Sequence, residues 1–212
     1  MHTSLWRRAR FGVWVWAALV AHGAVLAQDT AQASADQTAQ KVAASICSAC
    51  HGPAGVSASP LFPTLAGQQQ LYLAAQLKAF KGKTRGEQDA HDYMWGMATL
   101  LEDSVIDGLA RYYAAQKPAP GTPGRPALVE RGKVLYEKGD SAHNVVACAT
   151  CHGDAAQGNS IFPRLAGQHA SYVARQLDVI QHKFRDSPIM HGVIKELDAA
   201  DMKAVAEYVQ SK

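Results

Sequence analysis

The four cysteines of this 212-residue chain stand in two copies of one short pattern. The first copy reads ICSACHG, with Cys47 and Cys50, and the second reads ACATCHG, with Cys148 and Cys151. In each copy a histidine directly follows the second cysteine. Cys-x-x-Cys-His is the attachment signature of c-type haem, in which the two thiols add to the vinyl groups of the porphyrin. The pattern therefore predicts two covalently bound haem c groups.

The histidines that close the two patterns are His51 and His152. We expect each of them to bind a haem iron through Nε2. Three other interpretations compete with this one. A thioredoxin-like redox pair is typical of a βαβ context, a zinc site usually gathers its ligands in one cluster, and chance does not explain a pattern repeated inside a longer duplication. Haem attachment also uses all four cysteines, which leaves none for a disulfide.

The sequence around the two patterns is itself duplicated. LFPTLAGQQQLYLAAQLKAF, residues 61–80, matches IFPRLAGQHASYVARQLDVI, residues 161–180, in Phe-Pro, Leu-Ala-Gly-Gln, one Tyr and Gln-Leu. Residues 94–113 match residues 190–209 farther on. The repeated unit is much longer than a solenoid repeat, so we interpret it as a whole domain.

Composition and periodicity indicate where the domains lie and what they are made of. The stretch QKPAPGTPGRPA is rich in proline and glycine, which predicts a linker at 117–126 between a first domain at 36–116 and a second domain at 127–212. Inside the domains apolar residues recur at helical spacing, and no segment alternates as a strand does. We therefore predict an all-α fold of two tandem domains, each wrapped around one covalently attached haem.

Each iron needs a sixth ligand, and the duplication indicates which residue supplies it. Met94 and Met190 each stand seven residues before a matching leucine, so a methionine recurs at one place downstream of each cysteine pattern. An isolated methionine usually fills a core, but a duplicated one is a candidate axial ligand. Met97 aligns with Val193, and the histidines nearby have no duplicated partner.

The first residues are typical of an export signal. Arg7, Arg8 and Arg10 precede an uncharged apolar run that ends in small residues, which predicts a secretory signal peptide over 1–27. We expect residues 28–35 to form a flexible tether and the protein to reach the periplasm. An uncleaved membrane anchor and a twin-arginine signal are the alternatives. Covalent haem attachment requires an unfolded chain outside the cytoplasm, which disfavours the twin-arginine route.

The basic balance of the chain belongs to this leader. The full chain has a formal net charge of +3, and residues 1–27 contain three arginines and no acidic residue. The remaining chain is therefore formally neutral. It has no basic patch that would predict nucleic-acid binding.

Together these features resemble the di-haem class I c-type cytochromes of the cytochrome c4 family, and the resemblance covers nearly all of the chain after the leader. The two cysteine patterns, the two FPxLAGQ segments, the downstream methionines, and Tyr112 and Tyr208 in the last helices carry it. In that family a proline carbonyl after the haem histidine accepts its Nδ1 hydrogen, and Pro63 and Pro163 match this proline. Such a bond fixes the imidazole and tunes the iron.

The chain departs from the family in two places. Family members commonly carry a glycine in the first helix, where it meets the aromatic residue of the last helix. The second half offers Gly132, but the first half has Gln40 at the matching place, so the sequence supports close helix contact less strongly in the first domain than in the second. The stretch EKGDSAHNVVA before Cys148 is also longer than its counterpart before Cys47, so the two haem surroundings are expected to differ.

A haem iron with histidine and methionine ligands has no open position, which favours electron transfer over substrate chemistry. We therefore interpret the protein as an electron carrier and not an enzyme; a di-haem peroxidase would need one haem without a methionine. The resemblance implies delivery of electrons from a respiratory complex such as a cytochrome bc complex to a terminal haem-copper oxidase. Such partners would hold it at the periplasmic face of the membrane. The alternative is the electron-accepting cytochrome subunit of a periplasmic dehydrogenase, such as a flavocytochrome c.

Two arginines complete the candidate site residues. Arg85 and Arg185 stand at equivalent places between a predicted helix and the candidate methionine. Each could pair with a haem propionate through charge-assisted hydrogen bonds. A solvated surface charge is the alternative for both.

Overall fold

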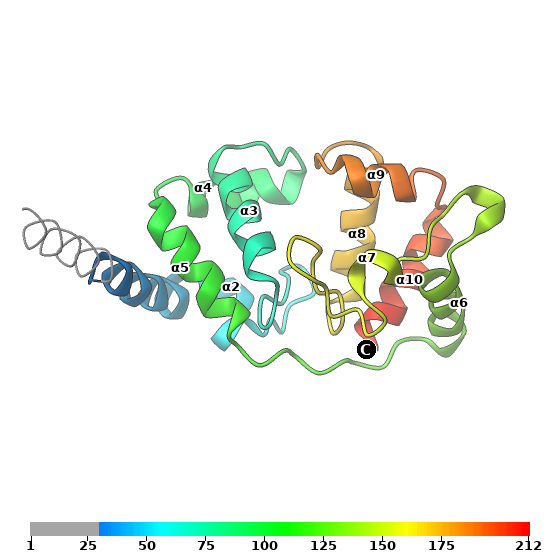
Figure 1. The fold of residues 1–212 in the computed structure, drawn as a ribbon, viewed down its shortest axis with the longest axis horizontal. Coiled ribbons are helices and arrows are strands. Elements are labelled where there is room, and N and C mark those ends of the chain that lie inside the picture. Colours follow the sequence, from blue (N-terminus) through cyan, green and yellow to red (C-terminus); the bar gives the residue numbers. More distant parts are fainter. Residues whose placement is uncertain (1–29) are drawn as a thin grey trace, which may run out of the picture.

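The computed structural model describes residues 30–212 (Figure 1). The signal peptide expected at 1–27 lies outside the described residues. The flexible tether expected at 28–35 is wrong for residues 30–35, which are helical and begin a helix that spans residues 30–42. Alanine and glutamine, which dominate this stretch, are strong helix formers, and Ala35 is buried with 8% of its surface exposed.

Within residues 30–212 the secondary structure is helical, with isolated bridges and no extended strand, as the sequence predicted. Helix 30–42 continues through a π-helical turn, η1 (Ala43–Cys47), into the next helix. The remaining elements of the first domain follow in the order α2 (Ser48–His51), η2 (Pro53–Gly55), α3 (Gln70–Lys81), η3 (Ala90–Met94), α4 (Trp95–Ala98) and α5 (Asp103–Ala114). Those of the second domain are α6 (Pro126–Lys138), η4 (Ser141–His143), α7 (Ala149–His152), α8 (Ala170–Gln181), α9 (Pro188–Ile194) and α10 (Ala199–Gln210).

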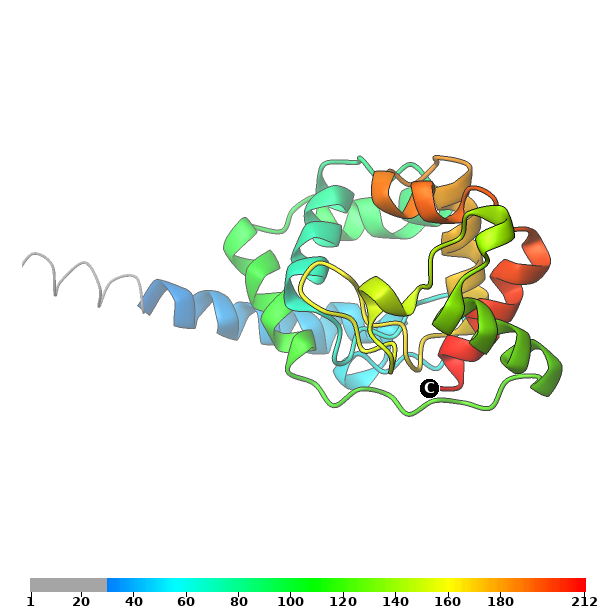
Figure 2. The same ribbon diagram turned by 45° about the vertical axis from the view of Figure 1, so that its right-hand side comes forward.

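The two domains repeat one packing scheme and lie side by side (Figures 1 and 2). In the second domain the last helix, α10, packs on both α6 and α8. In the first domain α5 packs on α3 in the same way, and its other side contacts helix 30–42. Each domain has its own cluster of buried apolar side chains around its last helix, centred on Leu109 in the first and on Val205 in the second.

Close contact between the first and last helices occurs in both domains, including the first, where the sequence supported it less strongly. In the second domain a Cβ added to Gly132 would lie 2.0 Å from the carbonyl oxygen of Ala204 and 2.8 Å from Cβ of Tyr208. In the first domain the small residue is on the last helix instead. A Cβ added to Gly108 would lie 2.8 Å from Cβ of Ala39. The glycine has changed helices, which an alignment of the first helices alone does not reveal.

The segment expected as a linker runs extended along the edge of both domains (Figure 1). It is held at several points. The ring of Pro118 lies against Gly67, the backbone N–H of Thr122 donates to the carbonyl of Gln210 at 3.0 Å, and α6 begins at Pro126. This attachment restricts how far the two domains can separate.

Candidate haem sites

The first cysteine pattern lies on a short helical segment, where α2 follows directly from η1. Residues three apart on a helix lie on one face, so the spacing of Cys47 and Cys50 turns both sulfur atoms to the same side. His51 ends α2 and has only 7% of its surface exposed. Its Nδ1 lies 2.8 Å from the carbonyl oxygen of Pro63. Because a carbonyl only accepts, Nδ1 carries the hydrogen and Nε2 has its lone pair free.

The second pattern has the same arrangement on α7. His152 is 4% exposed, and its Nδ1 donates to the carbonyl oxygen of Pro163 at 2.9 Å. Its Nε2 is buried and has no hydrogen-bond partner within residues 30–212. Buried polar atoms are nearly always partnered, so this free nitrogen is suited to binding a metal.

The protonation states of both histidines agree with this role. Burial lowers the pKa of His51 and of His152, while the hydrogen bond to the proline carbonyl opposes the shift in each case. At neutral pH the imidazoles are therefore uncharged, which is the form that binds iron.

Neither Cys47 nor Cys148 resembles a redox-active thiol. Burial raises the pKa of Cys47, although the nearby hydroxyl of Tyr113 opposes the shift, and burial raises the pKa of Cys148 to about 11. Redox-active thiols have a pKa well below the usual value. All four cysteines are free of disulfides, which leaves them available for thioether bonds.

A large apolar cavity opens beside the first pattern. It measures about 1030 Å³ with its solvent-open part included. Cys47 and His51 line one part of its wall and Met94 another, and apolar side chains that include Leu65, Leu73, Leu77, Phe80 and Leu109 line much of the rest. The lining, with apolar side chains, a free imidazole and a thioether sulfur, suits a porphyrin.

The structure separates the candidate methionines. Met94, the last residue of η3, lines the cavity with His51, whereas Met97 is 57% exposed and does not line it. Met190 lies on α9 and packs against the core of the second domain. The nearby histidines have other partners, since His91 contacts Asp92 at 2.9 Å and is mostly exposed.

Neither of the two arginines is a solvated surface charge. Arg85 and Arg185 are 5% and 8% exposed, and their backbones form an antiparallel bridge where the domains meet. Arg85 donates to Gln76 of its own domain and to Gln176 of the other domain. Arg185 donates to the same two glutamines and to the hydroxyl of Tyr72. Contact with haem propionates stays a prediction.

Sequence reasoning missed the residues that join the two domains. The side chain of Gln68 accepts from the backbone N–H of Arg164 at 2.7 Å and donates to its carbonyl at 2.9 Å. Gln168 makes the same pair of bonds to Thr64, at 3.0 and 2.9 Å. The signal was present, because the glutamine is part of the duplicated Leu-Ala-Gly-Gln segment. Duplication alone did not reveal that each copy binds the other.

Known proteins that are similar to this chain include cytochromes c4. The cytochrome c family profile matches residues 37–113 and 129–212. Cytochrome c4 of Azotobacter vinelandii is 39% identical over 191 residues, covering 85% of this chain and 90% of the relative. A thiosulfate dehydrogenase electron acceptor of Thiomonas intermedia is 36% identical over 180 residues, covering 80% and 79%. The solved structure of Acidithiobacillus ferrooxidans cytochrome c4 matches with a TM-score of 0.75 and 38% identity, covering 78% of this chain and 98% of that one.

The fold, the two patterns and these matches define a c-type cytochrome with two covalently bound haem c groups. Such a protein transfers electrons. The chain belongs to the cytochrome c family and, within it, to the di-haem cytochromes c4.

Proposed function

We propose that the protein is a periplasmic electron carrier in which His51 and Met94 bind one haem iron and His152 and Met190 bind the other. The observation that carries the proposal is the free, buried Nε2 of His152, together with the shared cavity of His51 and Met94. When bound, each haem supplies one-electron chemistry between Fe(II) and Fe(III).

The protein's own groups have distinct tasks in this proposal. The cysteine thiols anchor each haem. The proline carbonyls accept the Nδ1 hydrogen of each histidine, which leaves Nε2 unprotonated for the iron. The apolar part of the cavity wall keeps water away from the haem. Less solvent then has to reorient when the iron changes its charge. The methionine closes the sixth position, so no site is left for a substrate, and we propose that the chain is not an enzyme.

We propose delivery of these electrons to a terminal haem-copper oxidase from a cytochrome bc complex. The likeness to cytochromes c4 over most of the chain supports it. Within residues 30–212 no helix is both long and apolar enough to cross a membrane. Any attachment by an uncleaved leader would lie in residues 1–27, outside the described part of the chain.

A second candidate partner is a periplasmic dehydrogenase. The relative from Thiomonas intermedia, which is named a thiosulfate dehydrogenase electron acceptor, supports this alternative. The two candidates differ in where the electron comes from. Stopped-flow reduction of the oxidised protein by purified bc complex and by thiosulfate with its dehydrogenase distinguishes them, since the physiological donor should reduce it much faster than the other does.

Replacement of the methionines tests the ligand set. We expect Met94→Ala to lower the potential of the first haem and to let carbon monoxide bind its reduced iron. Axial ligands move haem potentials over a range of about 0.8 V, so the change should be clear in a redox titration. Met97→Ala is the matched control, because its side chain is exposed and outside the cavity. If Met97→Ala opens the iron and Met94→Ala does not, the ligand assignment is wrong.

A further inference from the structure

A buried polar network lies where the two domains meet, and most of its members come in pairs. Arg85 and Arg185 face each other across the boundary, and Gln76 and Gln176 each accept hydrogen bonds from both guanidinium groups. Residues that are paired in this way would have similar electrostatic effects on the two haems.

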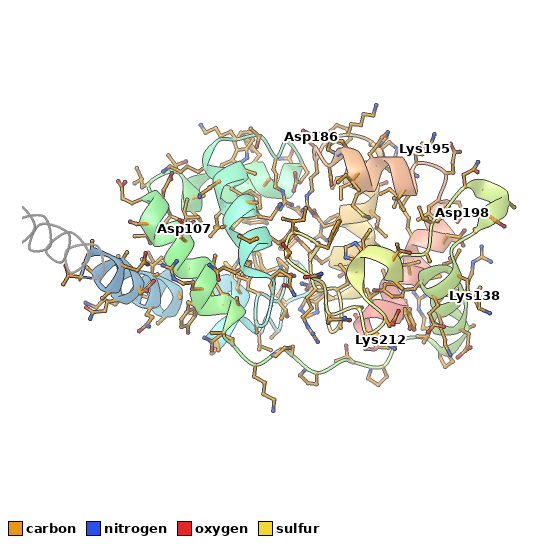
Figure 3. All side chains as sticks on the ribbon, in the orientation of Figure 1. Asp107, Lys138, Asp186, Lys195, Asp198 and Lys212 are labelled. Carbon is orange, nitrogen blue, oxygen red and sulfur yellow. The ribbon has the colours of Figure 1, made fainter. Side chains whose placement is uncertain are left out.

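One charged member of the network has no counterpart. Glu87 accepts hydrogen bonds through Oε1 from Nε of Arg85, at 2.7 Å, and from its Nη2, and the Glu87 side chain is 2% exposed. Counting from the matched arginines, Ser187 stands in its place. The only acidic residue between Arg185 and Met190 is Asp186, which is exposed at the upper edge of the molecule in Figure 3.

The segments that follow the two arginines also differ in length. Nine positions separate Arg85 from Met94, but only five separate Arg185 from Met190. The longer segment in the first domain contains the π-helical turn η3. The two domains therefore differ here both in the carboxylate of Glu87 and in the length of the segment that follows it.

Glu87 lies on the wall of the first haem cavity. It lines the same space as Cys47, His51 and Met94. Its Oε2 is buried and has no hydrogen-bond partner among residues 30–212. Water does not reach this group, so solvent screens its charge weakly. The carboxylate therefore offsets the positive charge of Arg85, which lines the same cavity. Asp89 also lines the cavity, but it is about one third exposed and pairs with Arg175 at 2.6 Å.

We propose that Glu87 lowers the reduction potential of the haem in the first domain. The inference rests on the proposed function, in which the cavity of His51 and Met94 holds a ligated haem. An iron that gains an electron loses one positive charge, so a fixed negative charge nearby favours the oxidised state. The second domain has only Ser187 at this place, and Arg185 there donates only to neutral groups in the described structure.

Glu87→Gln in the full holoprotein tests the proposal, because it removes the charge and keeps the shape. We expect the reduction equilibrium of the first haem to shift toward Fe(II) by about tenfold, equivalent to about 59 mV for one electron. The second haem should shift less. Haem-methyl NMR resonances followed through a redox titration report each haem separately. Asp89→Asn is the matched control, since it removes a charge from the same cavity at a more exposed place and should shift the first haem by less than half as much.

A structural role is distinguished by a second variant. Glu87→Asp keeps the charge, so the potential should stay near that of the wild type even where the thermal midpoint falls. Equal shifts of both haems, no shift, or a shift no larger than that of Asp89→Asn would overturn the proposal. Failure of the proposed function looks different, because the unmodified protein would then bind carbon monoxide at its reduced haems. If Glu87→Gln does not fold, Glu87→Asp decides alone. A tenfold shift of the reduction equilibrium of its first haem, in either direction, then counts against the proposal.

Discussion

The contact between α6 and α10 makes a quantitative prediction for Gly132→Ala. The new Cβ would stand 2.0 Å from the carbonyl oxygen of Ala204, where an ordinary contact begins at 3.4 Å. The helices would have to separate by roughly 1.4 Å, because a backbone atom cannot turn away as a side chain can. Overpacking of this kind costs about 1–3 kcal/mol, and the clash with backbone puts this site at the upper end.

The gain in helix propensity offsets part of that cost. Alanine is favoured over glycine in a helix by about 1 kcal/mol, so we expect a net loss of about 2 kcal/mol in the free energy of unfolding of the second domain. For a domain of this size that corresponds to a fall of about 8–16 °C in Tm. Thermal unfolding of the holoprotein followed by far-UV circular dichroism and haem absorbance measures it.

Lys133→Ala is the matched control, since the neighbouring side chain on α6 is exposed. It should change Tm by no more than a few degrees, as surface substitutions change stability by about 0.5 kcal/mol or less. Gly108→Ala should have an intermediate effect on the first domain, because its new Cβ meets a side-chain atom of Ala39 at 2.8 Å. If Gly132→Ala is as stable as Lys133→Ala, the close approach of the two helices is refuted.

Two further predictions concern the η4 loop and the first haem. The hydrogen bond and charge of Asp140 raise the pKa of His143. Their contact therefore stabilises the loop fully below the ordinary histidine pKa, and this stabilisation is lost as pH rises through the raised pKa. In an NMR titration, the pKa of His143 should be lower in Asp140→Asn than in the wild type. Replacing Cys47 and Cys50 by alanine blocks the first haem, and because a bound cofactor stabilises only the folded state, limited proteolysis should then cut residues 36–116 while the second domain stays intact; a first domain that resists protease without haem would contradict this.

Much of the candidate site could be predicted because its residues are local in sequence and duplicated. A Cys-x-x-Cys-His pattern is read directly, and the second copy serves as a check on the first. The same comparison selected Met94 over Met97, and the structure gives these two residues different surroundings, a cavity wall and an exposed surface. Helical periodicity was likewise sufficient to predict the all-α fold.

The misses have a common physical cause, which is contact between residues far apart in the chain. Local propensity favours a helix at residues 30–35, but its place against the domain is set by the packing of Ala35 near Gly108 and by the ion pair between Asp36 and Arg111. The burial of Arg85 depends on acceptors in the other domain. No local pattern contains that information, because it is set by how the two copies dock.

The reciprocal bonds of Gln68 and Gln168 make the contact between the two domains self-complementary. Each glutamine binds the backbone of the opposite domain at the equivalent place, so one patch recognises a copy of itself. That is the form of an isologous twofold dimer interface. Here the two equivalent patches belong to one chain, joined through residues 117–126. Their contact is therefore intramolecular, and its extent does not depend on protein concentration.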